Sequence, residues 1–125
     1  MQGVDVLVIG GGAAGIGTAA SIRRRDGEAQ ITVIEPESTH FYQPAWAMVA
    51  GGLYDQTRSG RAMASCIPSG VRWLRGRAAA FEPAISTVVL ASGERLAYRV
   101  LVVCPGIQAN WRAIAGSRRR SDAMG

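Results

Sequence analysis

Three glycines near the start of the chain restrict what it can fold into more than any other feature. Gly10, Gly12 and Gly15 form the pattern G-x-G-x-x-G directly after an apolar, β-branched run at residues 4–9. An Ala-rich segment at 13–25 follows, with apolar residues near helical spacing and three arginines at its end. Cations there stabilise the negative pole of a helix dipole. The pattern therefore predicts a strand buried on both faces, a tight turn and a helix.

Each glycine has its own physical reason: the first allows the turn, the second lets the backbone approach a diphosphate, and the third lets helix and strand pack closely. Unpaired N–H groups at the helix start, near Ala13 and Ala14, then face an anion. A second β-branched strand is predicted at 31–34, and Glu35 ends it, 20 residues past Gly15. A carboxylate there accepts hydrogen bonds from ribose hydroxyls. The spacing predicts dinucleotide binding rather than a glycine turn without a ligand.

Glu35 also bears on the kind of dinucleotide, because a carboxylate repels a 2′-phosphate that an arginine would attract. The choice between FAD and NAD depends on the next part of the chain. Residues 71–74 predict a third strand, and short β-like segments follow at 77–81, 85–90 and 95–98 with no helix-length pattern between them. The third crossover is therefore predicted to be a β-meander. By analogy with the glutathione-reductase type of domain, a meander favours FAD.

The fold class predicted from these elements is α/β. Short helices are expected at 45–49 and 60–64, and an apolar strand at 100–103. Together they predict a truncated, Rossmann-like FAD/NAD(P)-binding domain, with a parallel sheet and a β-meander crossover, over residues 1–111. Residues 112–125 have no hydrophobic period and are expected to form a disordered tail.

Composition excludes several other classes. A chain of 125 residues with 48% hydrophobic residues builds one core of ordinary size. Its net charge of +5 is divided among separated arginine clusters, which argues against a nucleic-acid partner. Two cysteines and one histidine give neither a CxxC motif nor a metal site. The uncharged stretch at 6–22 is short for a membrane span, and Asp5 stands where a signal peptide needs positive charge.

Three further motifs carry a family resemblance. They are HFYQP at 40–44, ASCIPSGV at 64–71 with Trp73, and VCPGIQ at 103–108. With the glycine turn, they resemble the sulfide:quinone oxidoreductases over residues 4–111, closest to the branch that includes the mitochondrial enzymes. The resemblance implies an FAD-dependent, peripherally membrane-bound enzyme that oxidises sulfide to a sulfane-sulfur product and passes two electrons to quinone.

The resemblance also implies roles for single residues. It places Ala13 and Ala14 on the diphosphate, Glu35 on the ADP ribose and Gln43 beside the flavin nucleotide. It places the backbone of Ala78 at the adenine and Gly106 at a strand end near the cofactor. The expected cofactor-binding residues are Gly10, Gly12, Ala13, Ala14, Gly15, Glu35, Gln43, Ala78 and Gly106.

No catalytic residue is expected in this chain. In the resembling branch the reactive cysteine pair lies further along, so Cys66 and Cys104 are interpreted as buried core thiols. His40 is interpreted as either a flavin-side or a turn residue, and the structural role is favoured. The family continues for a few hundred residues beyond the resemblance, so we expect little or no turnover from this chain alone, and membrane association only through the missing C-terminal parts. The expected location is cytoplasmic or peripheral on the inner face of a membrane.

Two alternative functions remain open. They are a non-catalytic dinucleotide-binding remnant and an NADH:quinone oxidoreductase of the same superfamily.

Overall fold

The first half of the fold is a βαβ unit. The computed structural model describes residues 2–116, and most of the predicted tail, 117–125, lies outside the described residues. Strand β1 (Gln2–Ile9) is followed by helix α1 (Ala13–Arg25) and by strand β2 (Ile31–Ile34), which pairs parallel with β1. The predicted bounds of α1 and β2 are confirmed, and β1 begins two residues earlier than the predicted start at residue 4.

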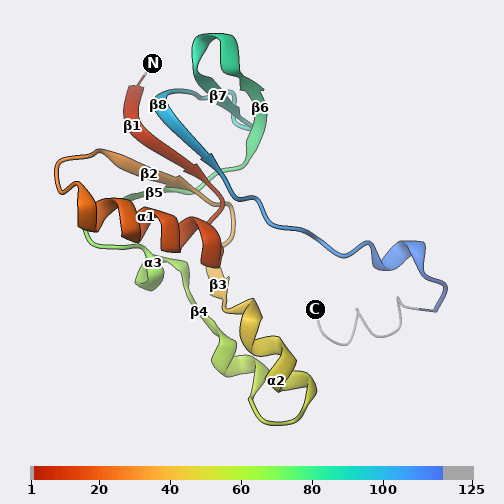
Figure 1. Ribbon diagram of the computed structural model, residues 1–125. Helices are drawn as coiled ribbons and strands as arrows, with labels where there is room; N and C mark the ends of the chain where they lie inside the picture. The colour runs from red at the N-terminus through yellow and green to blue at the C-terminus, as the bar shows by residue number, and fades with distance from the viewer. Residues whose placement is uncertain (1, 117–125) are drawn as a thin grey trace.

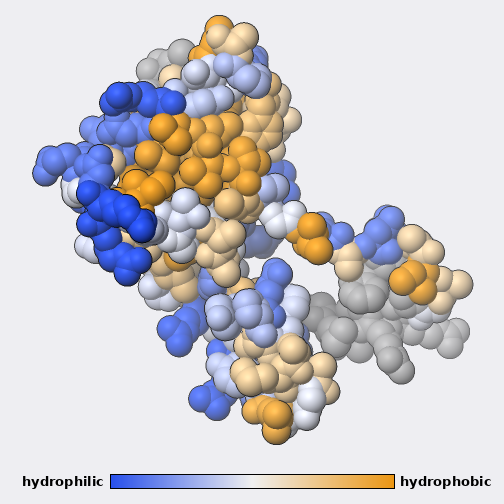
Figure 2. All heavy atoms as spheres, in the orientation of Figure 1, coloured by the Kyte–Doolittle hydropathy of each residue, from blue (hydrophilic) through white to orange (hydrophobic). Residues whose placement is uncertain are grey.

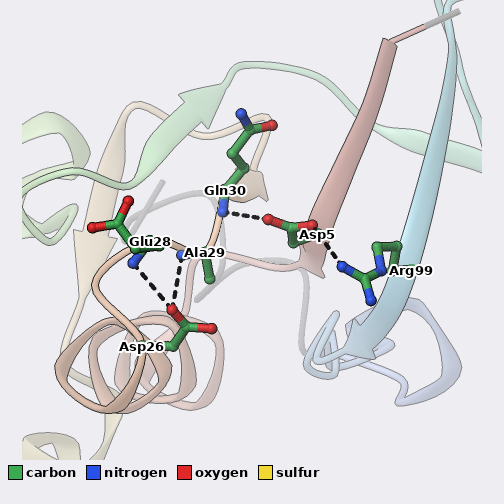
Figure 3. A network of polar contacts seen from close by, with 6 residues as sticks. All are labelled: Asp5, Asp26, Glu28, Ala29, Gln30 and Arg99. Atoms are coloured by element: carbon green, nitrogen blue, oxygen red, sulfur yellow. Dashed lines mark hydrogen bonds and ion pairs between the residues drawn. The ribbon is translucent and has the colours of Figure 1, made fainter.

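Asp26 and Asp5 fix the loop between α1 and β2. After α1 ends, Asp26 Oδ1 accepts the N–H groups of Glu28 and Ala29 at 3.0 and 3.1 Å. Asp5 Oδ2, on β1, accepts the N–H of Gln30 at 2.9 Å, as Figure 3 shows. These bonds set where β2 starts beside β1, because side chains of this kind satisfy backbone groups that no ladder reaches.

The second half adds four strands to the same sheet. They are β5 (Arg72–Leu74), β6 (Ala78–Glu82), β7 (Thr87–Leu90) and β8 (Arg95–Val103). The strand order is β5-β2-β1-β8-β7-β6. Pairing is parallel from β5 to β8 and antiparallel along β8, β7 and β6. The parallel sheet with a meander as its third crossover, predicted from sequence, is confirmed.

Two apolar clusters pack on opposite faces of this sheet. On the α1 face lie Val6, Val8, Ala19, Ala29, Ile31 and Val33, and on the other face lie Leu7, Ile9, Ile34, Val88, Leu90 and Leu96. Residues 6–9 of β1 are thus buried on both faces, as predicted. The neighbouring strand β8 is less covered, because Val100 and Val103 are 53% and 52% exposed. Figure 2 shows apolar side chains gathered over β1 and β8.

A long excursion leaves the sheet after β2 and returns before β5 (Figure 1). It contains strand β3 (Thr39–Phe41), a 3-10 helix (Gln43–Ala45), helix α2 (Trp46–Ala50), a second 3-10 helix (Gln56–Ser59), strand β4 (Gly60–Ala62) and helix α3 (Met63–Cys66). Strands β3 and β4 pair antiparallel. Figure 1 shows α2 projecting away from the sheet. No helix in residues 2–116 is long and apolar enough to span a bilayer.

In the excursion, two helices differ from those predicted from the sequence. The helix predicted at 45–49 forms at Trp46–Ala50, after a 3-10 turn. The helix predicted at 60–64 is wrong for its first residues, because 60–62 form β4 against β3 and the helix starts only at Met63. Residues 95–98 and 100–103, expected as two segments, form the single strand β8, and a short 3-10 helix (Trp111–Ala113) follows it.

Candidate functional site

A cleft of about 730 Å³ lies where β1, β2 and β8 end. Parallel sheets carry their ligands outside the carboxyl ends of the strands, so this position is the expected one. The cleft is lined by Gly11, Gly12, Ala13, Ala14, Glu35, Glu37, Thr39, His40, Phe41, Gln43, Pro44, Met63, Cys104, Pro105, Gly106 and Ile107. Among these described lining residues there is no Lys or Arg, so positive potential toward an anion comes from backbone amides.

The three glycines of the turn differ in what surrounds them. Gly10 has φ +105°, and a Cβ on it would overlap the carbonyl oxygen of Cys104. A Cβ on Gly15 would overlap the carbonyl oxygen of Gly10. Gly12 has nothing within 4 Å of a Cβ position and is exposed at the cleft. Gly10 and Gly15 therefore serve the packing of the turn, whereas Gly12 leaves room for a group that occupies the cleft.

Helix α1 presents its first turn to the same cleft. It starts at Ala13, and its N-cap Gly12 has no side-chain cap hydrogen bond. Ala13 and Ala14 are exposed lining residues, and the first turn contains no acidic residue. The first N–H groups of an α-helix have no acceptor within the helix, and the dipole makes this end positive. The arrangement is suited to an anion such as a diphosphate.

Glu35 is fixed in the wall of the cleft by four hydrogen bonds. Its Oε2 accepts the N–H of Gly11 at 2.7 Å, and its Oε1 accepts the N–H of Glu37 at 2.9 Å. Its backbone N–H donates to Leu74 at 3.3 Å, and its carbonyl accepts Trp73 Nε1 at 3.0 Å. A carboxylate has about four acceptor positions. Two bonds leave this one with capacity for the two hydroxyls of a ribose.

Several lining residues could not be found by sequence reasoning. Gly11 is buried, and a Cβ on it would lie 2.8 Å from Glu35 Cγ and 3.1 Å from Met63 Sδ. His40 Nδ1 lies 2.8 Å from the carbonyl oxygen of Gly11. The only signal for Gly11 is the run of three successive glycines at 10–12. For Met63 no sequence signal exists, since it reaches the cleft through the β3–β4 pairing.

Most of the predicted cofactor-binding residues meet at this cleft. Gly12, Ala13, Ala14, Glu35, Gln43 and Gly106 line it, and Gly10 and Gly15 form the turn beneath it. Ala78 does not line it; it begins β6 and packs against the apolar cluster that contains Leu90. The prediction that both thiols are buried in the core is wrong. Cys66 and Cys104 are free and only partly buried, and Cys104 lines the cleft because β8 ends at its rim.

The sheet, the glycine turn and the acidic residue after β2 define a Rossmann-type dinucleotide-binding protein. The chain belongs to the pyridine nucleotide-disulphide oxidoreductase family, whose sequence profile matches residues 4–123.

Comparison with known proteins confirms the resemblance inferred from the motifs. The chain is 40% identical over 112 residues to a mitochondrial sulfide:quinone oxidoreductase of Mus musculus, covering 90% of this chain and 25% of that protein. The crystal structure of the sulfide:quinone oxidoreductase from Aquifex aeolicus is similar with a TM-score of 0.71 and 25% identity, covering 86% of this chain and 25% of that one.

NDH2 from Plasmodium falciparum, solved with NADH, shares the fold with a TM-score of 0.68 at 14% identity, covering 93% of this chain and 25% of that one. The chain thus spans about a quarter of the length of the relatives it matches.

Proposed function

We propose that residues 1–111 bind the ADP half of FAD as the N-terminal part of a flavin-dependent sulfide:quinone oxidoreductase. The observation that carries the proposal is the convergence of the exposed first turn of α1 and the spare acceptor capacity of Glu35 on one cleft. The relatives at 40% and 25% identity favour sulfide over NADH as the electron donor of the whole enzyme.

Each residue has a proposed part in holding the cofactor. The N–H groups of Ala13 and Ala14 bind the diphosphate, Gly12 gives it room, and Glu35 accepts the ribose hydroxyls. Gln43 and Gly106 lie beside the flavin nucleotide. Ala78 lies outside the cleft lining, and its proposed backbone contact with the adenine rests on the family resemblance alone. Bound FAD supplies the two-electron chemistry, which the lining side chains do not supply themselves.

In the whole enzyme, sulfide is oxidised, quinone is reduced and the protein associates peripherally with a membrane. The chain alone is proposed to bind the cofactor without turnover, because the reactive cysteines of the resembling branch lie outside it. A whole protein that reduces quinone with NADH and not with sulfide would assign it instead to the NADH:quinone oxidoreductases.

Calorimetric titration of the purified chain with ADP, FAD and a 2′-phosphorylated ADP tests the binding claim. We expect ADP and FAD to bind, and the 2′-phosphate to weaken binding by about tenfold or more. The phosphate replaces a hydroxyl that would donate a hydrogen bond to Glu35, and its charge is repelled by the carboxylate. A chain that binds none of the three, and stays colourless with FAD after gel filtration, would contradict the proposal.

A further inference from the structure

The two peptide groups that flank Gly11 are each held by a side chain from the segment that follows β2. Its N–H donates to Glu35 Oε2 at 2.7 Å, and its carbonyl oxygen lies 2.8 Å from His40 Nδ1. Gly11 is buried between the flanking side chains of Glu35 and Met63, whereas the next residue, Gly12, is exposed at the cleft. The orientations of these two successive peptide groups therefore decide how the backbone enters α1.

The contact between His40 and Gly11 determines where the imidazole carries its proton. A carbonyl oxygen can only accept a hydrogen bond, so Nδ1 must be the donor. In a neutral ring the second nitrogen, Nε2, then carries no proton. This tautomer is set by a backbone group of the glycine turn, and His40 is the one histidine of the chain.

The main chain around His40 is held by contacts that do not involve the glycine turn. In the β3–β4 pair it is the partner of Arg61. Two residues before His40, the carbonyl oxygen of Ser38 accepts the N–H of Met63 at 2.8 Å. Four residues before it, the carbonyl oxygen of Pro36 accepts a hydrogen bond from Arg75 Nε at 3.1 Å. One backbone bond and one bond from an arginine side chain thus fix the main chain that leads to His40. The excursion, which the glycine pattern does not predict, supplies one of the two groups that hold the turn.

We propose that His40 is a positioning residue for the diphosphate of the bound dinucleotide. By donating from Nδ1 to the Gly11 carbonyl, it holds the turn so that the N–H groups of Ala13 and Ala14 already face the cleft before the ligand arrives. Preorganisation of this kind raises affinity because less ordering is left for the binding step. The proposal rests on the proposed function, since it assigns a role within the same site.

The isosteric pair H40N and H40L tests the role of the donor. Asn can place an N–H where Nδ1 is, whereas Leu has the same size and no donor. We expect H40L to weaken ADP binding about tenfold, because it leaves the Gly11 carbonyl without its partner, and H40N to bind within about threefold of the unchanged chain. Equal binding by H40L and the unchanged chain would overturn the proposal. So would equally weak binding by both variants, which would indicate direct contact between the ring and the ligand.

The tautomer gives a readout that does not depend on ligand binding. A two-bond ¹H–¹⁵N correlation spectrum of the single imidazole, recorded without ADP and at a pH where the ring is neutral, should show a protonated Nδ1 and an unprotonated Nε2. The opposite tautomer would overturn the proposal even if ADP binds. Failure of ADP to bind the unchanged chain, with the expected tautomer present, would instead count against the proposed function while the Gly11 contact stood.

Discussion

The two ends of the βαβ unit are closed by the same kind of bond, and only one of them is a candidate binding site. At the amino end, Asp5 of β1 accepts the N–H of Gln30, which precedes β2. At the carboxyl end, Glu35, which follows β2, accepts the N–H of Gly11, which follows β1. The Asp5 bond joins residues 25 apart in the sequence, and the Glu35 bond joins residues 24 apart. Each carboxylate therefore links β1 to β2.

The surroundings of the two carboxylates differ. Asp5 also receives Arg99 at 3.4 Å, and nearby Asp26 is occupied by two backbone N–H groups (Figure 3). The hollow there, about 390 Å³, is lined by Asp5, Asp26 and Arg99 together with Glu28 and apolar residues, and contains no helix N-terminus among these described lining residues. Glu35 faces a cleft of about 730 Å³ together with the first turn of α1. Asp5 and Glu35 each accept two hydrogen bonds, so a carboxylate bond between strands is structural at both ends. What makes the carboxyl end a candidate site is the uncapped first turn of α1 beside the open cleft.

The largest effect is expected from G15A, which tests whether the carboxyl end of the βαβ unit depends on the close approach of α1 to the glycine turn. The new Cβ on α1 would overlap the carbonyl oxygen of Gly10, a backbone atom that cannot swing aside as a flexible side chain can. We expect the free energy of unfolding to fall by about 3 kcal/mol, as overpacking of a tight contact does. Urea denaturation followed by circular dichroism measures it. A loss below about 1 kcal/mol would show that the turn can relax.

The matched pair E35Q and D5N tests the comparison itself. Both remove one negative charge from a carboxylate that accepts a backbone N–H. We expect E35Q to weaken ADP binding by about thirtyfold, because bonds from hydroxyls to a charged group are worth roughly 1.5–3 kcal/mol. Removing a charge that repels the diphosphate would act the other way, so the sign is informative. D5N should leave ADP affinity unchanged in the same calorimetric titration. Equal effects of the two would break the distinction between the ends.

A second pair, G12A and G27A, compares glycines with open space at the two ends. Neither Cβ would meet another atom within 4 Å. We expect G12A to weaken ADP binding about tenfold, because its methyl group would keep the diphosphate from the amides, with a stability change under about 1 kcal/mol. G27A, in the loop after α1, should change neither quantity measurably. Unaltered ADP affinity in G12A would place the diphosphate elsewhere.

The smallest effect concerns acid stability at the amino end. The hydrogen bond from the Gln30 N–H, with help from Arg99, holds the pKa of Asp5 below its ordinary range. A lowered pKa stabilises the folded chain above the ordinary carboxyl value, and this contribution is lost as the pH falls through the lowered pKa. D5N should therefore melt slightly below the unchanged chain at pH 7, and the difference should begin to shrink below about pH 4 and vanish once the carboxyl is protonated in the folded chain as well. A melting-temperature difference that persists at pH 2 would contradict this reasoning.

Sequence reasoning succeeded where one physical rule acts over a few neighbouring residues. The β-branched runs, the Ala-rich helix and the glycine spacing predicted β1, α1 and β2 because each depends on local periodicity and on the absence of a Cβ. The meander followed from the lack of any helix-length pattern between β5 and β8.

The failures arose where distant residues decide the outcome. The helix expected from residue 60 yields to β4 because Gly60 pairs with Phe41 across the excursion. Arg99, charged and in the middle of β8, made one strand look like two. Gly11 contacts Glu35, His40 and Met63, and Cys104 lies at the cleft, only because the folded chain brings these distant segments together.

The most direct test of the central claim is a ¹H–¹⁵N correlation spectrum of the labelled chain, recorded as ADP is added. We expect the largest shifts on the amides of Gly12, Ala13 and Ala14, and almost none on Gln30 beside Asp5. Shifts centred on Gln30 and its neighbours, or no shifts at saturating ADP, would contradict it.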